Sequence, residues 1–145
     1  MRKNQAQRTE MQRPHVNSNF LVDLGYADPQ SFSGGFSEVI FPEFRINDSH
    51  PPQDDATRSK VLILKRGATG MLDLYDWWNK ARRGKSPKER TVTVMLMAED
   101  RSTVVLTWDF HRVRPVSLSY SPLNAMDGGV LIESIELAFD SMEMR

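Results

Sequence analysis

The sequence predicts a mostly β protein, an antiparallel β-barrel or sandwich that carries one short α-helix. Stretches of alternating apolar and polar residues recur along the chain, and this period is typical of half-buried strands. Short segments rich in Gly, Pro and Asp separate these stretches, as turns between strands require. Only residues 67–87 combine apolar residues at helical spacing with helix-ending residues, so a single helix is expected.

The composition limits the possible function classes. The 145 residues correspond to about one domain, and 19 basic residues balance 19 acidic ones, so no charge surplus indicates nucleic acid or a membrane surface. The absence of cysteine excludes disulfides, thiolate metal sites and cysteine nucleophiles. No apolar run approaches the roughly 18 residues of a membrane helix, and the N-terminus lacks a signal-peptide core. We therefore expect assembly in the cytoplasm without membrane insertion of the monomer.

Residues 1–18 are predicted to be an N-terminal extension, followed by a β domain over residues 19–145. The extension is polar and lacks periodicity, and its first 16 residues carry four basic side chains and one acidic one. Two interpretations remain open. The segment is either a solvated tail or an arm that becomes ordered on a partner subunit.

The first half of the chain contains three predicted strands and one long loop. In the first strand Phe20, Val22 and Leu24 share one face. Pro42 cannot donate a ladder hydrogen bond, so it marks an edge, a bulge or a bend in the second strand. The predicted strands cover residues 19–26, 36–46 and 60–66. The loop over residues 47–59 has two prolines and three aspartates, and a loop of this length is usually mobile or used for contact.

The predicted helix lies in the segment GATGMLDLYDWWNKARRGKSP, residues 67–87. Thr69 is a suitable N-cap, Gly84 a suitable C′ residue, and Pro87 blocks continuation of the helix. Four residues fall at positions i, i+3, i+4 and i+7 of one face: Met71, Leu74, Tyr75 and Trp78. This spacing assigns Trp78 to the core. Trp77 points about 100° away and would cover a seam or a neighbouring subunit.

Strands resume after the helix. The predicted strands cover residues 90–98, 102–113, 114–122 and 128–144, with a hairpin turn at residues 99–101. In the last of them Glu133 interrupts an apolar face that includes Ile135 and Leu137. The total is about seven strands and one helix, which favours a barrel or sandwich over a parallel sheet.

No arrangement of residues predicts catalysis, a cofactor site or a metal site. The three histidines do not form a compact ligand set. Asp48, Asp54 and Asp55 lack the spacing of a calcium-binding EF-hand loop and are expected to be solvated. We therefore expect a protein that is not an enzyme. One alternative of a different class is a small nucleic-acid-binding β-barrel that uses Trp77 and the basic residues 80–90.

Some predicted strands have no evident partner along an edge, and some are apolar on both faces. A chain that completes its sheet with other copies of itself would show these features, because unpaired edges invite strand pairing. A closed sandwich would show them too, and the pattern alone leaves both possibilities open.

Five sequence blocks occur in an order that resembles the tail-tube proteins of contractile phages and related contractile injection systems. The blocks are NFLVDLG, GGFSEV, LKRGATGMLDLYDWW, TWDFHRVRPVSLSYSPLNA and IESIELAFDSME, which span residues 19–143. The resemblance implies a structural protein. Six subunits would form a ring with a continuous inter-subunit β-barrel, and stacked rings would form the inner tube of the tail.

The resemblance also implies partners and contact residues. The partners would be further copies, a contractile sheath protein, baseplate and tube-cap proteins, and a cargo of DNA or protein toxin. The particle would be a virion tail or an injection system, extracellular after release. A tube-terminating or baseplate-proximal paralogue remains an alternative within the family. The candidate contact residues belong to the second strand, the long loop and the helix; they are Phe36, Glu38, Ile40, Asp48, Asp54, Asp55, Trp77 and Trp78.

Overall fold

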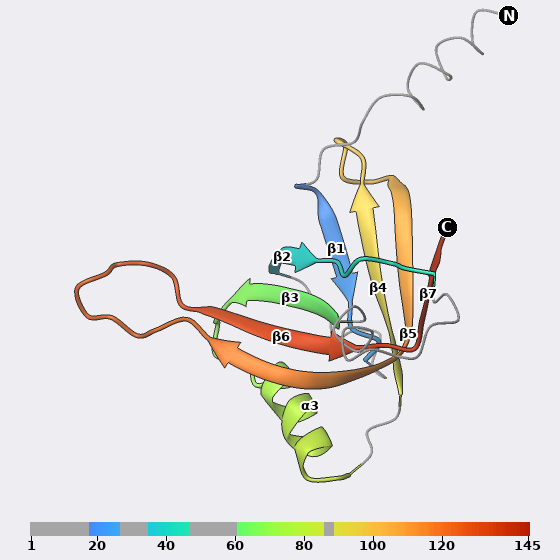
Figure 1. Cartoon of the computed structure of the whole chain (residues 1–145). Helices are drawn as coiled ribbons and strands as arrows, with labels where there is room; N and C mark the ends of the chain where they lie inside the picture. The colour runs from blue at the N-terminus through green and yellow to red at the C-terminus, as the bar shows by residue number, and fades with distance from the viewer. Residues whose placement is uncertain (1–17, 27–34, 47–60, 86–88) are drawn as a thin grey trace, which may run out of the picture.

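The structure is a computed structural model that describes residues 18–26, 35–46, 61–85 and 89–145. This part of the chain contains seven strands and one helix (Figure 1), which confirms the mostly β fold with a single helix. Their bounds are β1 Phe20–Asp23, β2 Phe36–Ile40, β3 Val61–Gly67, α3 Asp73–Arg82, β4 Arg90–Met97, β5 Val104–Tyr120, β6 Ile132–Ala138 and β7 Ser141–Met144. The strand β2 stops before Pro42, whereas residues 36–46 were predicted as one strand.

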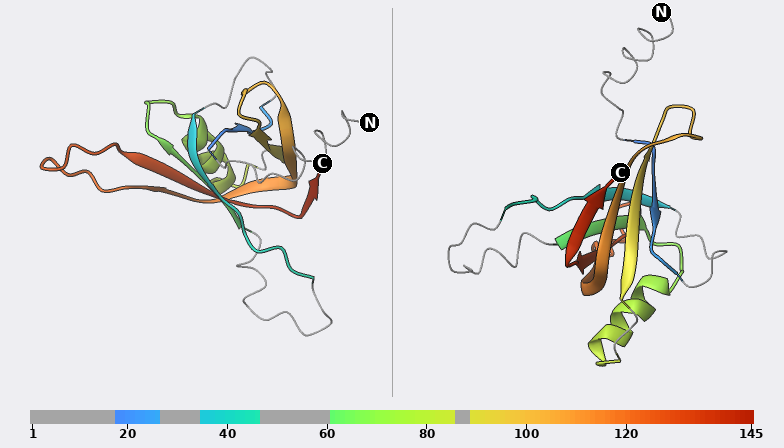
Figure 2. Two further views of the ribbon diagram at one scale, coloured as in Figure 1. Left: turned by 90° about the horizontal axis from the view of Figure 1, so that it is seen from above. Right: turned by 90° about the vertical axis from the view of Figure 1, so that its right-hand side faces the viewer.

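The strands pair in the order β1-β4-β5-β6-β3-β2, with β7 also on β5, and every pairing is antiparallel. They form two sheets that share β5. We call them the β4 sheet (β1, β4, the first part of β5, and β7) and the β6 sheet (the last part of β5, β6, β3 and β2). The strands of the two sheets cross at a large angle (Figure 2), so the long strand β5 passes from one layer into the other.

The strand β5 corrects the prediction of two strands at residues 102–113 and 114–122. Its 17 residues pair with β4 and β7 up to Val113 and with β6 from Arg114 onward. Arg112 has a φ of 55°, and a further register shift lies between Pro115 and Ser117. Such bulges bend a strand without ending it. The predicted boundary between residues 113 and 114 therefore marks a bend.

The C-terminal residues show the opposite correction, because the predicted strand over 128–144 is two strands. After β6 the chain turns at Phe139 and Asp140, and β7 pairs with β5 in the β4 sheet. The Asp140 amide donates to the His111 carbonyl at 3.0 Å and holds this turn. Alternation continues through the turn, so the sequence pattern alone does not reveal the change of sheet.

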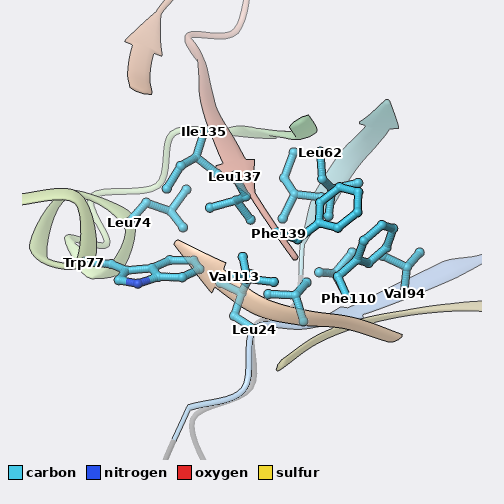
Figure 3. Close-up of a cluster of buried hydrophobic side chains, with 13 residues drawn as sticks. Leu24, Leu62, Leu74, Trp77, Val94, Phe110, Val113, Ile135, Leu137 and Phe139 are labelled. Carbon is cyan, nitrogen blue, oxygen red and sulfur yellow. The ribbon is translucent and has the colours of Figure 1, made fainter. Parts of the chain in front are cut away.

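The hydrophobic core lies between the two sheets and α3 (Figure 3). Val22 of β1 and Leu24, which directly follows β1, are buried there, as the alternation predicted. Phe110 and Phe139 meet edge to face with their ring centroids 4.9 Å apart. The remaining core comes from the central strands and the helix: Leu62, Leu64, Leu74, Trp77, Val92, Val94, Val113, Ile135 and Leu137.

The helix buries a different face from the predicted one. Leu74 and Trp77 are buried, whereas Trp78 is half-buried and Tyr75 is exposed. The assignment of Trp78 to the core was wrong, because α3 begins at Asp73 and Met71 lies outside it. Leu72, rather than Thr69, occupies the N-cap position and makes no side-chain cap. The C-terminal end agrees with the prediction, since Gly84 has a φ of 71° and donates to the Ala81 carbonyl.

Gly25→Ala is expected to destabilise the subunit by about 1–3 kcal/mol. Gly25 has a φ of 71°, and an added Cβ would lie 2.5 Å from the Thr91 carbonyl oxygen on the neighbouring strand. Chemical unfolding of the two proteins measures the difference. Gly84→Ala is the matched control, because its φ is also 71° but no atom lies within 4 Å of the added Cβ. Equal losses for the two variants would contradict the role of the close contact.

Candidate functional site

The β6 sheet has two edges without a partner strand among the described residues. One edge is β2, which pairs only with β3. The other is the last part of β5, residues 114–120, which pairs with β6 on one side while the pairings to β4 and β7 end before it. Unpaired edges present rows of N–H and C=O groups that bind a further strand. The resemblance suggested β2 as a contact strand, but the pattern did not reveal the β5 edge.

The two faces of the β6 sheet differ in chemistry. One face carries Leu62, Leu64, Ile135 and Leu137 into the core. On the other face the register places Glu38, Lys65, Ser134 and Ser119 side by side across all four strands. This polar row borders an open hollow of about 470 Å³. The hollow is lined by Ser37, Glu38, Lys65, Ser119, Tyr120, Ser121, Ile132 and Ser134.

The candidate residues of β2 divide between these two faces. A register shift between Phe36 and Glu38 puts Phe36 on the core side, where the Arg66 guanidinium lies 5.5 Å from its ring centroid. Glu38 pairs with Lys65 at 3.9 Å on the polar face, and Ile40 is exposed. The other strand candidates therefore remain accessible to a partner, whereas Phe36 contributes to the subunit's own packing.

The two tryptophans of α3 also have different surroundings. Trp77 is 2% exposed and lies under the Arg90 guanidinium, which is 4.4 Å from its ring centroid. Trp78 packs at the surface against Tyr75, with ring centroids 6.2 Å apart, and below Arg82 at 5.1 Å. Trp78 is thus the tryptophan available to a neighbour. The remaining candidates, Asp48, Asp54 and Asp55, lie outside the described residues.

A buried ion cluster connects the helix to the β6 sheet, and the sequence analysis missed it. Arg66 on β3 is 2% exposed and donates from Nε to Glu133 on β6 at 2.5 Å. Its other end donates to Asp73 in the first turn of α3, with Nη1 at 3.2 Å from Oδ2. The Tyr26 hydroxyl also donates to Asp73. Glu133 does not interrupt the apolar face but neutralises a cation within it.

The pKa shifts in this cluster follow from burial and pairing. Burial by itself raises the pKa of Asp73, but hydrogen bonds from Arg66 and Tyr26 outweigh it and hold the pKa below its usual value. Burial, reinforced by the hydrogen bond to Asp73, raises the pKa of Tyr26. The sequence signal for the cluster was available: Arg66 and Glu133 stand in phase with buried Leu64 and Ile135.

The described residues show neither a metal site nor a membrane-spanning helix. Residues 18–26, 35–46, 61–85 and 89–145 contain no group of His, Asp and Glu suited to a metal ion. No described helix is long and apolar enough to cross a membrane. Within the described ranges, the chain is thus a β protein with one sheet that has a polar face and two edges without a partner strand, which suits it to pair with further strands.

Residues 49–143 match the family of the T4-like virus tail tube protein gp19, and the chain belongs to this family. It is thus a structural tube subunit, as the resemblance predicted. No curated protein sequence matches the chain.

Solved structures share the fold. A chain of the anti-feeding prophage baseplate has 25% sequence identity and a TM-score of 0.75, with 92% of this chain and 96% of that chain covered. A chain of the extended sheath-tube complex of the extracellular contractile injection system PVC has 19% identity and a TM-score of 0.72, with 96% of each chain covered. Hcp1 from Flavobacterium johnsoniae has 11% identity and a TM-score of 0.57, covering 86% and 93%.

Proposed function

We propose that six copies of this chain form a ring in which the β6 sheets join into one continuous barrel around a lumen. The observation that carries the proposal is the pair of unpaired edges on a single sheet, β2 on one side and residues 114–120 of β5 on the other. Joining the β5 edge of one copy to the β2 edge of the next satisfies both rows of backbone groups. A closed barrel then leaves no edge for uncontrolled pairing.

The strand directions support this closure. Within the β6 sheet each strand runs opposite to its neighbour, so β2 and β5 at the two margins run in opposite directions. A rotated copy therefore places its β2 antiparallel to the adjacent β5. Each seam repeats the pairing found inside the subunit, and the interface is heterologous, as a closed ring requires.

The polar face of the β6 sheet would line the lumen, because its other face is filled by the core. Glu38 neutralises Lys65 on this face, and serines dominate the rest of the row. Glu38 and Ile40 would lie beside the seam with the neighbouring β5. A lumen of this composition would carry DNA or a protein toxin as cargo without a strong site that retains it.

The helix would lie close to a neighbouring subunit. Trp78 and Tyr75 lie at the surface of α3 with their ring centroids 6.2 Å apart, and they would form the apolar part of that contact. Trp77 Nε1 and Arg90 Nη1 have no hydrogen-bond partner within the part of the chain that the structure describes, but they are buried inside the subunit and closed to a neighbour.

Solved neighbours from a baseplate, a tube-terminating cap and a sheath-tube complex support the proposed partners. These are further copies of the chain, a contractile sheath protein, a baseplate and a tube cap, and assembly would take place in the cytoplasm. The role of the chain would be structural rather than catalytic, without a cofactor. The match to a tail tube family favours the main tube over a terminating paralogue.

The loop aspartates Asp48, Asp54 and Asp55 would contact the next ring. Residues 1–18 would form an N-terminal extension of the β domain, residues 19–145.

Tyr120→Pro is expected to abolish ring formation while leaving the subunit folded. The Ser121 amide donates toward β6, to the Ile132 carbonyl at 2.9 Å, so by alternation the Tyr120 amide points to the unpaired edge. Proline removes that donor from the seam. Native mass spectrometry and circular dichroism measure the oligomer and the fold.

Tyr120→Ala is the control for this variant, because it removes the same side chain and keeps the amide. We expect it to form hexamers. Hexamers from both variants, or from neither, would contradict a seam that uses this backbone edge.

A further inference from the structure

The hairpin between β5 and β6, residues 121–131, extends well beyond the body of the subunit (Figure 1), and we call it the arm. Three of its apolar side chains are largely exposed. Leu123 is 87% exposed, Met126 is 94% exposed and Val130 is 73% exposed. Several exposed apolar residues gathered on one protruding hairpin are typical of an interaction site.

The arm holds its shape through its own hydrogen bonds. The Met126 amide donates to Asn124 Oδ1 at 2.9 Å, and the Gly129 amide donates to Asp127 Oδ1 at 3.1 Å. At its base the Ala68 amide donates to the Leu131 carbonyl at 2.8 Å. A preformed arm loses little conformational freedom on binding, so its exposed side chains are ready to dock.

A second exposed apolar surface lies at the opposite end of the β6 sheet. The arm is located at the end of the sheet where β5 ends and β6 begins. β2 ends at the opposite end of the sheet, measured along the strands, and the chain continues there into residues 41–46 (Figure 1). There Phe44 is 47% exposed and Ile46 is 92% exposed. Phe44 lies on the subunit's own aromatic residues, with centroid distances of 6.4 Å to Phe110 and 6.5 Å to Phe139. Phe44 and Ile46 form what we call the rim patch.

We propose that the arm of one subunit docks on the rim patch of a subunit in the next ring, so that apolar contacts stack the rings. This inference rests on the proposed ring. Because strand ends lie at the two rims of a barrel, the arm and the rim patch would face opposite directions along its axis. A head-to-tail contact between two different surfaces that is repeated along the axis, rather than around it, cannot close into a ring and therefore generates an open stack. The occupant of each surface is another copy of this chain.

The sharpest test uses the absence of cysteine from the chain. A variant with both Met126→Cys and Ile46→Cys is assembled and then oxidised, and the products are separated on a non-reducing denaturing gel. Docking between rings links subunits along the tube without limit. We expect a ladder of covalent oligomers that extends past the hexamer and collapses to monomer after reduction. Either cysteine alone is the control and gives dimers at most.

The alternative outcomes each have a defined meaning. A ladder that stops at six subunits places the arm on a neighbour within the ring and overturns the proposal. Tubes that form without crosslinking overturn it as well. If the chain without substitutions forms no hexamers in native mass spectrometry, the proposed ring itself is overturned. Failure of the ring is therefore distinguishable from failure of the docking between rings.

A second measurement avoids dependence on one cysteine pair. Leu123→Ser combined with Met126→Ser should leave hexamers intact but raise the protein concentration needed for tube growth by about tenfold or more. Val104→Ser is the matched control, because Val104 is also an exposed apolar residue at 44% but lies outside the arm. Electron microscopy and sedimentation measure tube growth. Unchanged growth of the double variant would overturn the proposal.

Discussion

Trp77→Ala is expected to destabilise the subunit by about 3–5 kcal/mol, the largest loss for any side chain of α3. The indole is 2% exposed and fills the space between the helix and the β5 strand (Figure 3). Its removal leaves a cavity that the two sheets cannot close, because each is held by its own ladder hydrogen bonds. It also removes the ring beneath the Arg90 guanidinium, which is 4.4 Å from the ring centroid.

The adjacent tryptophan provides the matched control. Trp78→Ala removes a half-buried ring whose contacts are Tyr75 and Arg82 at the surface, so we expect a loss of about 1 kcal/mol. Urea unfolding should be measured on the Tyr120→Pro background, where ring formation does not contribute to stability. Equal losses for the two tryptophans, or a larger loss for Trp78, would contradict the burial of Trp77.

Arg66→Met is the second large effect, with an expected loss of about 3–5 kcal/mol at neutral pH. The variant keeps the apolar stem but removes the cation that faces Glu133 and Asp73. The buried Glu133 and the partly buried Asp73 then remain without this cation, and the penalty of an uncompensated charge exceeds the value of the pair itself. Arg82→Met is the control, because the Arg82 guanidinium bonds Asn79 at the surface.

The loss in Arg66→Met should depend on pH in a defined direction. In the wild type the pKa of Asp73 is depressed, so its contribution is present above the unfolded pKa of about 3.9 and disappears as the pH falls through the folded value. In the variant only the Tyr26 hydroxyl still opposes burial at Asp73, so the pKa of this carboxyl is higher than in the wild type and its protonation relieves the penalty. The difference in unfolding free energy should therefore shrink between pH 7 and pH 4. A difference that is constant over this range would exclude the ion cluster as its source.

A double variant separates the charge effect from loss of packing. Arg66→Met combined with Glu133→Leu removes one cation and one anion together and places two apolar side chains in the space. We expect it to recover part of the stability lost in Arg66→Met alone. A double variant less stable than the single one would show that the cluster contributes mainly through packing.

The sequence predicted the features that depend on short-range pattern. Alternation located the first strand and its buried residues Val22 and Leu24, and Gly84 located the end of the helix. The ordered blocks identified the tail tube family. The helix face was harder to predict, because Trp77 and Trp78 are adjacent and a shift of one residue in phase exchanges their roles. The apolar spacing from Met71 suggested the wrong phase, since Met71 lies before the first turn.

By itself the sequence determined the β class, the helix after β3 and the family, because local alternation and residue identity suffice for these. Only the tertiary structure decided which strands share a sheet, since pairing partners lie far apart in the chain. It showed that β5 bends at Arg112 from one sheet into the other and that Glu133 neutralises Arg66 inside the core. Among the residues that it describes, it also located two edges of the β6 sheet without a partner strand. An edge is defined by the absence of a neighbour in space, and no pattern along one strand records that.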